Sequence, residues 1–154
     1  MAANKILIVD DNESERFLIH RILVKIGISS EDIEEAIDGE EGYNKIVHGN
    51  FIPYIVLLDI NMPKMNGLEV LVKVRAEMQT LPPYIIILTT SQQESDLGNA
   101  ITGGVNAFAV KPNEPSRIKN ILDAVKLIFI NKAVLSSELK KLFSYINIEE
   151  NQTI

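Results

Sequence analysis

Carboxylate, hydroxyl and ammonium side chains follow four apolar segments of the chain. The run KILIV ends at Asp10 and Asp11, the run YIVLL at Asp59, the run YIIIL at Thr89, and the run NAFAV at Lys111. Carboxylates packed together repel one another and have raised pKa values unless a cation joins them. Mg²⁺ prefers oxygen ligands, and an aspartate beside Mg²⁺, an ammonium and a hydroxyl can accept a phosphoryl group. The pattern favours a phosphoryl-accepting metal site over solvated turns and helix caps.

The segments that carry these side chains alternate between strand and helix patterns. Uninterrupted apolar runs are typical of strands buried on both faces of a parallel sheet. The sequence predicts strands near residues 5–9, 33–37, 54–58, 84–88 and 106–110, and helices near 12–26, 38–47, 67–77 and 116–130. A further helix at about 94–101 has weaker support, because Gly98 lies inside it and Gly103-Gly104 follow, and we expect it to be mobile. This alternation predicts an α/β fold whose strands end at one rim, where ligands bind.

Composition narrows the class of protein. The chain has 154 residues, 46% of them apolar, and a formal net charge of −6. These values predict one globular unit, and the scattered basic residues argue against a nucleic-acid surface. The absence of cysteine from the sequence excludes disulfides and fits a cytoplasmic location. We find no signal-peptide pattern and no apolar run long enough to span a membrane, so we expect no membrane insertion.

The same residues carry a resemblance to a known family. Asp10-Asp11 after the first strand, Asp59 within DINMPKMNG, Thr89 after the fourth strand and Lys111-Pro112 after the fifth resemble the receiver domain of bacterial two-component response regulators, in family order over roughly residues 4–130. The resemblance implies a flavodoxin-like (α/β)5 three-layer sandwich with a five-stranded parallel sheet of order 2-1-3-4-5. It further implies a phosphoacceptor that promotes its own phosphorylation and dephosphorylation but is not an enzyme.

Residue roles follow from the resemblance. It implies that Asp59 is the phosphoacceptor and also a metal ligand. Asp11 would bind Mg²⁺ directly, Asp10 through water, and Asn61 through its backbone carbonyl. The remaining implied roles concern the phosphoryl group and its read-out: Thr89 is the switch hydroxyl, Lys111 the phosphoryl-binding cation, Phe108 the aromatic that turns inward, and Pro112 a cis-proline.

Two positions depart from the family pattern. Thr90 stands where relatives often have Ala or Ser, and Val105 replaces a common alanine. The first narrows access to Asp59, and the second has no expected chemical consequence. Phe108 also has a plain structural interpretation, because an aromatic residue in a last strand is often simply part of the core.

The chain continues past the expected last helix. We assign residues 1–130 to a receiver domain and 131–154 to a helical extension, without a separate output domain. Apolar spacing from Val134 to Ile146 predicts either one extended C-terminal helix or a break near Ser136-Ser137 followed by a short sixth helix. The extension would pack on its own domain or form a homodimer contact, and the sequence leaves both open.

These observations predict a stand-alone response regulator. A sensor histidine kinase or a histidine phosphotransfer protein would donate the phosphoryl group to Asp59, and the output would be a contact with a downstream protein. One alternative is a receiver-like scaffold that acts without phosphorylation. Another is a Mg²⁺-dependent phosphatase with an aspartyl-phosphate intermediate, but such enzymes typically carry a second Asp two residues after the first, and here position 12 is Asn.

Overall fold

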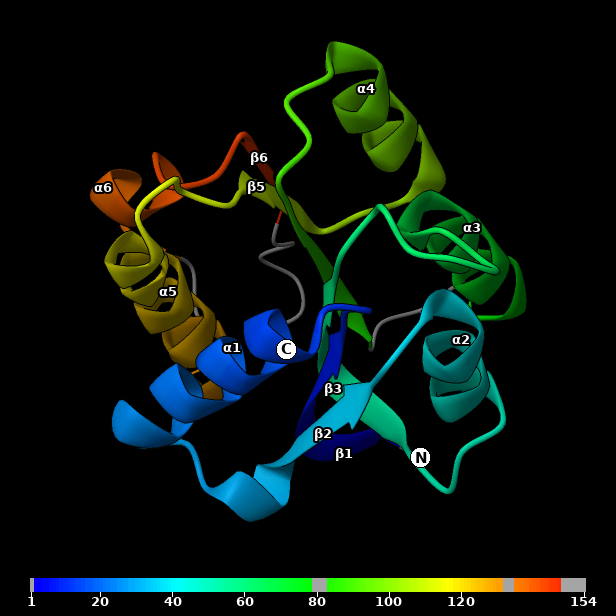
Figure 1. Cartoon of the computed structure of the whole chain (residues 1–154), viewed down its shortest axis with the longest axis horizontal. Helices are drawn as coiled ribbons and strands as arrows, with labels where there is room; N and C mark the ends of the chain where they lie inside the picture. Colours follow the sequence, from blue (N-terminus) through cyan, green and yellow to red (C-terminus); the bar gives the residue numbers. More distant parts are fainter. Residues whose placement is uncertain (1, 79–82, 132–134, 148–154) are drawn as a thin grey trace.

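The computed structural model describes residues 2–78, 83–131 and 135–147, and its strands and helices alternate as predicted (Figure 1). Five strands run parallel in the order β2-β1-β3-β4-β5. Their bounds are Ala2–Val9 for β1, Ile33–Ala36 for β2, Ile52–Leu58 for β3, Tyr84–Thr89 for β4 and Ala107–Val110 for β5. The predicted flavodoxin-like strand order is therefore confirmed.

Helices cover both faces of this sheet. On one face lie α1, Glu13–Lys25, and α5, Ile118–Asn131, and on the other lie α2, Gly39–Val47, α3, Gly67–Glu77, and α4, Glu94–Gly103 (Figure 1). Alternate strand residues supply two separate cores: Ile6 and Ile8 pack toward α1 and α5, whereas Leu7 and Val9 pack toward α2 and α3. Burial on both faces explains why these strands are apolar throughout.

Side-chain caps determine where the helices that follow the carboxyl ends of the strands begin. Asn12 is the N-cap of α1, and its side-chain oxygen accepts the backbone N–H of Glu15 at 3.1 Å. Asn66 begins α3 with a reciprocal capping box, because Glu69 also accepts the backbone N–H of Asn66 at 3.2 Å. The fourth helix, which the sequence indicates only weakly, is formed: α4 runs unbroken through Gly98 to Gly103.

The C-terminal segment differs from a purely helical extension. After α5 comes a short helix α6, Ser137–Lys140, with Ser136 as N-cap, in agreement with the predicted break. The strand β6, Tyr145–Ile146, then pairs antiparallel with β5 as a sixth strand that the sequence does not predict. A strand of two residues has no measurable hydrophobic period, so the sequence carried no signal for it.

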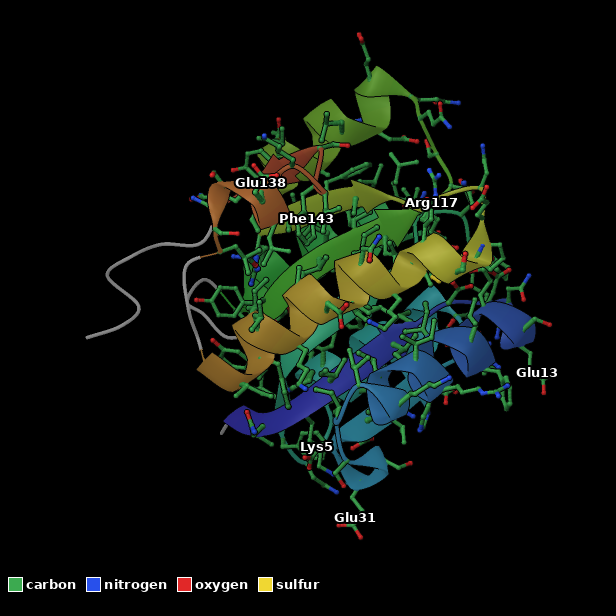
Figure 2. The ribbon with its side chains drawn as sticks, turned by 90° about the vertical axis from the view of Figure 1, so that its left-hand side faces the viewer. Lys5, Glu13, Glu31, Arg117, Glu138 and Phe143 are labelled. Atoms are coloured by element: carbon green, nitrogen blue, oxygen red, sulfur yellow. The ribbon has the colours of Figure 1, made fainter. Side chains whose placement is uncertain are left out.

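The segment from α6 to β6 packs on the receiver itself. The backbone N–H of Ser144 donates to the carbonyl of Phe108 at 2.8 Å, which secures the segment to the β5 edge. Leu135 and Phe143 are 4% and 7% exposed and belong to the core between the sheet and α5. Figure 2 views this side, with the α1 and α5 layer toward the viewer and Phe143 beside α6. Among the residues described, no helix is both long and apolar enough to cross a bilayer.

Candidate functional site

The register of the strands brings the site residues predicted from the sequence to one rim of the sheet. Val9 pairs with Leu58, and the backbone N–H of Asp59 donates to the carbonyl of Val9 at 3.0 Å. On the other side of β4, the backbone N–H of Lys111 donates to the carbonyl of Thr89 at 2.7 Å. Each functional side chain therefore starts at the end of a buried, hydrogen-bonded strand, and the sheet fixes their relative positions.

Three carboxylates form the centre of the rim. Asp10, Asp11 and Asp59 each offer an oxygen within 4.8 Å of the others. Asp10 is buried, Asp59 is partly buried, and Asp11 is exposed, so the cluster opens toward solvent on one side. The predicted convergence of the three acids is what the structure shows.

Hydrogen bonds fix the carboxylates of Asp10 and Asp59. Oδ1 of Asp10 accepts the backbone N–H of Asn12 at 2.9 Å, and Oδ2 accepts from Nζ of Lys111, also at 2.9 Å. Oδ1 of Asp59 accepts the backbone N–H of Ile60 at 2.9 Å. These contacts restrain the orientation of both carboxylates before any ligand binds.

Burial dominates the titration of Asp59. Desolvation and the negative charge of Asp10 raise the pKa of Asp59 to about 6, although the positive charge of Lys111 opposes the rise. The nearby hydroxyl of Thr89 and the hydrogen bond from the Ile60 backbone N–H also lower the pKa of Asp59. A carboxyl group that is costly to ionise in its pocket is one that a nearby cation would stabilise as the anion.

Lys111 provides the positive charge that the fold itself contributes. Its ammonium lies 2.9 Å from Oδ2 of Asp10 and 3.1 Å from Oε2 of Glu15, and its side chain is 7% exposed. Burial alone would lower the pKa of Lys111, but the hydrogen bond to Asp10 and the surrounding carboxylate charges outweigh it. The pKa of Lys111 is therefore raised, and the side chain is charged at neutral pH.

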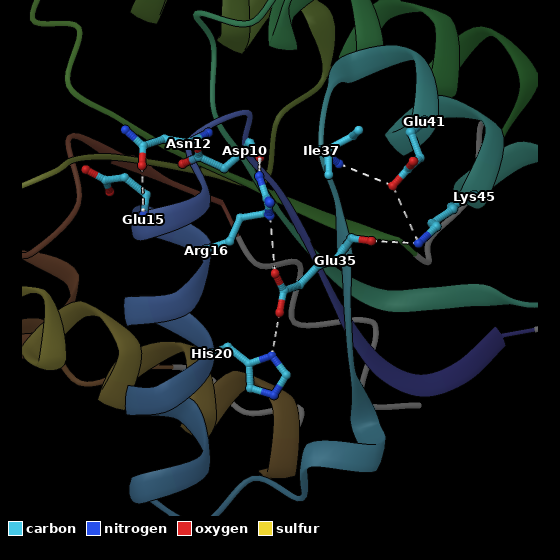
Figure 3. A network of polar contacts seen from close by, with 9 residues as sticks. All are labelled: Asp10, Asn12, Glu15, Arg16, His20, Glu35, Ile37, Glu41 and Lys45. Carbon is cyan, nitrogen blue, oxygen red and sulfur yellow. Dashed lines mark hydrogen bonds and ion pairs between the residues drawn. The ribbon is translucent and has the colours of Figure 1, made fainter.

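A second cation supports the rim from the α1 side. Nη1 of Arg16 donates to the backbone carbonyl of Asp10 at 2.7 Å, and its Nε donates to Glu35 on β2 at 3.2 Å (Figure 3). Nδ1 of His20 lies 2.7 Å from the other carboxylate oxygen of Glu35. Lys45 of α2 donates to the Glu35 backbone carbonyl. The network ties the end of β1 to α1, β2 and α2.

Glycine allows the loop after Asp59 to fold closely over the strand end. A Cβ on Gly67 would lie 2.0 Å from the backbone oxygen of Asp59, and one on Gly39 would lie 1.8 Å from the backbone oxygen of Met65. Neither separation is sterically possible, so both positions require glycine. Within the loop, Lys64 adopts a positive φ of 68°, which marks its tight turn.

The other predicted site residues lie at different depths. Thr89 is fully buried at the end of β4, and Thr90 next to it is exposed. Asn61 is exposed in the loop that follows Asp59. Phe108 is 2% exposed and lies within β5 rather than at the rim, in the core on the α3 and α4 side and opposite Tyr145 in the β5–β6 register.

The donor set fits a hard divalent cation. Carboxylate oxygens from three side chains converge at a partly open rim, and the burial of two of them makes an added positive charge favourable. Mg²⁺ binds few protein carboxylates and keeps several waters, so the open side at Asp11 suits it. Asp10, Asp11 and Asp59 are the residues that could hold the ion.

The contacts of three charged residues in this region, Glu15, Arg16 and Glu35, could not be predicted from the sequence. Glu15 lies in the first turn of α1, and its carboxylate contacts Lys111. Arg16 and Glu35 face each other between α1 and β2. Their charges were visible in the sequence, but which charges meet depends on the packing of α1 over the sheet.

Comparison with known proteins gives a consistent result. The family described as "Response regulator receiver domain" matches residues 6–123. The chain is 36% identical over 121 residues to the chemotaxis protein CheY1 of Helicobacter pylori, covering 79% of this chain and 95% of that protein. It is equally similar to the chemotaxis protein CheY homolog of Campylobacter jejuni, of which it covers 91%.

Solved structures show the same architecture. The phosphorylated cyanobacterial phytochrome response regulator RcpA aligns with a TM-score of 0.74 at 26% identity, over 86% of this chain and 98% of that one. The Vibrio cholerae chemotaxis protein CheY4 aligns with a TM-score of 0.64 at 30% identity, over 79% and 97%. Each solved chain is covered almost completely, and the likeness extends over 79–86% of this chain.

Proposed function

Because the chain belongs to the response regulator receiver domain family, we propose that it accepts a phosphoryl group on Asp59 and signals through a protein contact that depends on this modification. The observation that carries the proposal is the cluster of Asp10, Asp11 and Asp59, with the ammonium of Lys111 hydrogen-bonded to Asp10 at the same rim. A surface acid would need neither the burial nor the partners that Asp59 has.

The donor we propose is a histidine kinase or a histidine phosphotransfer protein of a two-component system. Its phosphohistidine would meet Asp59 at the open side of the rim. The bond between the histidine nitrogen and phosphorus breaks as a bond forms between phosphorus and a carboxylate oxygen of Asp59. The imidazole leaves with the electron pair and takes up a proton from solvent.

The protein's own groups position this transfer. Bound Mg²⁺ would neutralise charge on the phosphoryl oxygens. The hydrogen bond from the backbone N–H of Ile60 holds one oxygen of Asp59 in place. Lys111 can bind a second phosphoryl oxygen, and the Thr89 hydroxyl, already near Asp59, can donate to a third.

We propose that phosphorylation changes the conformation of the protein at β5. Phosphorylation adds a charge of about −1.5 to −2 at Asp59, and Thr89 would move toward it. Phe108, one strand away, would then repack in the space that Thr89 leaves, which biases the β5 face between two arrangements. The similarity to chemotaxis proteins makes another signalling protein the downstream partner that we propose.

We also propose that the C-terminal segment packs on its own domain rather than forming a dimer. This proposal is supported by the burial of Leu135 and Phe143 in the core next to α5. Size-exclusion chromatography with light scattering checks this: the full chain should have the mass of a monomer. A dimer that becomes monomeric on truncation at Lys132 would contradict the proposal.

The function is tested with a small phosphodonor such as acetyl phosphate. Purified protein with Mg²⁺ should gain one acid-stable, base-labile phosphoryl group per chain, and protein treated with a chelator should gain little. Absence of an adduct in the presence of Mg²⁺ would argue for a scaffold that acts without phosphorylation. Sustained hydrolysis of phosphomonoesters would instead indicate a phosphatase.

A further inference from the structure

Lys111 is held by a carboxylate that lies outside the acid cluster. Its ammonium contacts Oδ2 of Asp10 at 2.9 Å and Oε2 of Glu15 at 3.1 Å. Asp10 belongs to the group of three acids at the rim, whereas Glu15 comes from the first turn of α1. The lysine that we assign to phosphoryl binding is therefore shared between the pocket and the helix.

The local structure of α1 explains why Glu15 is available for this contact. Glu15 occupies the third helical position after the N-cap Asn12, where a glutamate often accepts the backbone N–H of the cap residue, as Glu69 does for Asn66. In α1 the backbone N–H of Asn12 donates to Oδ1 of Asp10 instead. The Glu15 carboxylate consequently extends to Lys111.

The two carboxylates that hold Lys111 differ in exposure. The side chain of Asp10 is 4% exposed and that of Glu15 is 34% exposed. Ion pairs that reach solvent are weak, because water replaces the lost partner, while buried pairs are costly to break. If Lys111 must turn toward new negative charge, the contact with Glu15 is the one that can be released.

We propose that Glu15 is a positioning residue that acts through Lys111, holding its ammonium on the α1 side of the pocket until negative charge is added at Asp59. The inference rests on the proposed function. Glu15 competes with the phosphoryl group for the same ammonium, and it repels the phosphoryl charge as well. Removing the Glu15 charge therefore makes the phosphorylated state easier to form.

Beryllofluoride tests this directly, because it binds a carboxylate oxygen as a non-covalent mimic of a phosphoryl group. Its dissociation constant would be measured calorimetrically on the whole chain at fixed Mg²⁺. Glu15→Gln should bind beryllofluoride about three- to fivefold more tightly than the wild type, the size expected for one partly exposed ion pair. Glu13→Gln is the matched control: it removes the same charge from the same helical turn at an exposed position, and it should match the wild type.

Two further measurements separate positioning from a general effect on the fold. Glu15→Asp keeps the charge but shortens the side chain by one methylene, so it should approach Glu15→Gln rather than the wild type. In the wild-type protein, the carbon NMR signal of the Glu15 carboxylate should shift when beryllofluoride binds, and that of Glu13 should not. A change in helix stability alone would produce neither result.

The outcomes distinguish this inference from the function on which it rests. Wild-type binding with equal affinities for Glu15→Gln and Glu13→Gln overturns the role of Glu15 and leaves the phosphoacceptor intact. Weaker binding by Glu15→Gln also overturns it, since Glu15 would then assist Lys111 rather than compete for it. No binding by the wild type overturns the proposed function and this inference with it.

Discussion

Nζ of Lys111 lies 2.9 Å from Oδ2 of Asp10, and this buried contact joins the loop after β5 to the end of β1. Lys111→Met would leave Asp10 buried beside Asp59 without its cation. We expect the free energy of unfolding, measured by urea titration with a chelator present, to fall by about 3 kcal/mol.

The chain offers a control with the same geometry at the surface. Lys119 and Asp123 of α5 are also 2.9 Å apart, but their side chains are 56% and 40% exposed. Lys119→Met should therefore change the free energy of unfolding by less than about 1 kcal/mol. Equal losses for the two variants would show that burial of the Lys111 pair has no special effect.

Asp59→Asn should stabilise the protein at neutral pH. Burial raises the pKa of Asp59 to about 6 in the folded protein, so the folded state holds its proton more tightly than the unfolded chain. This contribution to stability is fully present below about pH 4 and is lost as the pH rises through 6. The variant avoids that loss.

The expected gain follows from the pKa shift. Without Mg²⁺, the free energy of unfolding of Asp59→Asn should exceed that of the wild type by about 3 kcal/mol at pH 8. Near pH 4 the two proteins should differ little. Urea titrations at both values check this, and a gain that is the same at each would mean that the charge of Asp59 is not its source.

Arg16→Lys should weaken Mg²⁺ binding although the charge is kept. Lysine cannot bond the Asp10 carbonyl and the Glu35 carboxylate together as the guanidinium does. Residues that orient metal ligands typically change affinity by about tenfold or more, and we expect about tenfold here by calorimetry. Arg21→Lys, exposed on the same helix, is the control; matching affinities in both variants would remove Arg16 from this role.

Two glycine substitutions should change the stability of the fold in opposite directions. Gly67→Ala forces the loop away from the Asp59 carbonyl, which a Cβ would approach to 2.0 Å, and should destabilise the fold by more than about 2 kcal/mol. A Cβ on Gly98 meets nothing within 4 Å inside α4, so Gly98→Ala should stabilise it by about 0.5–1 kcal/mol. Thermal unfolding of both variants tests the pair; a neutral Gly67→Ala would show that the loop relaxes freely.

The strand ends could be predicted because apolar runs and their terminal residues are local in the sequence. Parallel strands then bring Asp10, Asp59 and Lys111 to one rim by topology alone. The contact of Glu15 with Lys111 could not be predicted this way. It depends on how α1 packs over the sheet and on which carboxylate accepts the backbone N–H of the N-cap residue Asn12.

The sequence also could not predict the close approach of Gly67 to Asp59 or the short strand β6. A glycine in a loop is common, and only the three-dimensional path shows that a side chain there would collide with a backbone oxygen. The pairing of Tyr145 with Phe108 adds one strand at the β5 edge, where two residues give no periodic pattern.

Asp59 itself is the residue that we propose carries the phosphoryl group, and chemical mapping of the site tests this directly. The protein would be incubated with Mg²⁺ and acetyl phosphate, reduced with borohydride, which converts an aspartyl phosphate to homoserine, and mapped by tandem mass spectrometry. We predict homoserine at position 59 in the wild type and no conversion anywhere in Asp59→Asn. Homoserine at Asp10 or Asp11, or conversion that persists in Asp59→Asn, would show that another residue carries the phosphoryl group.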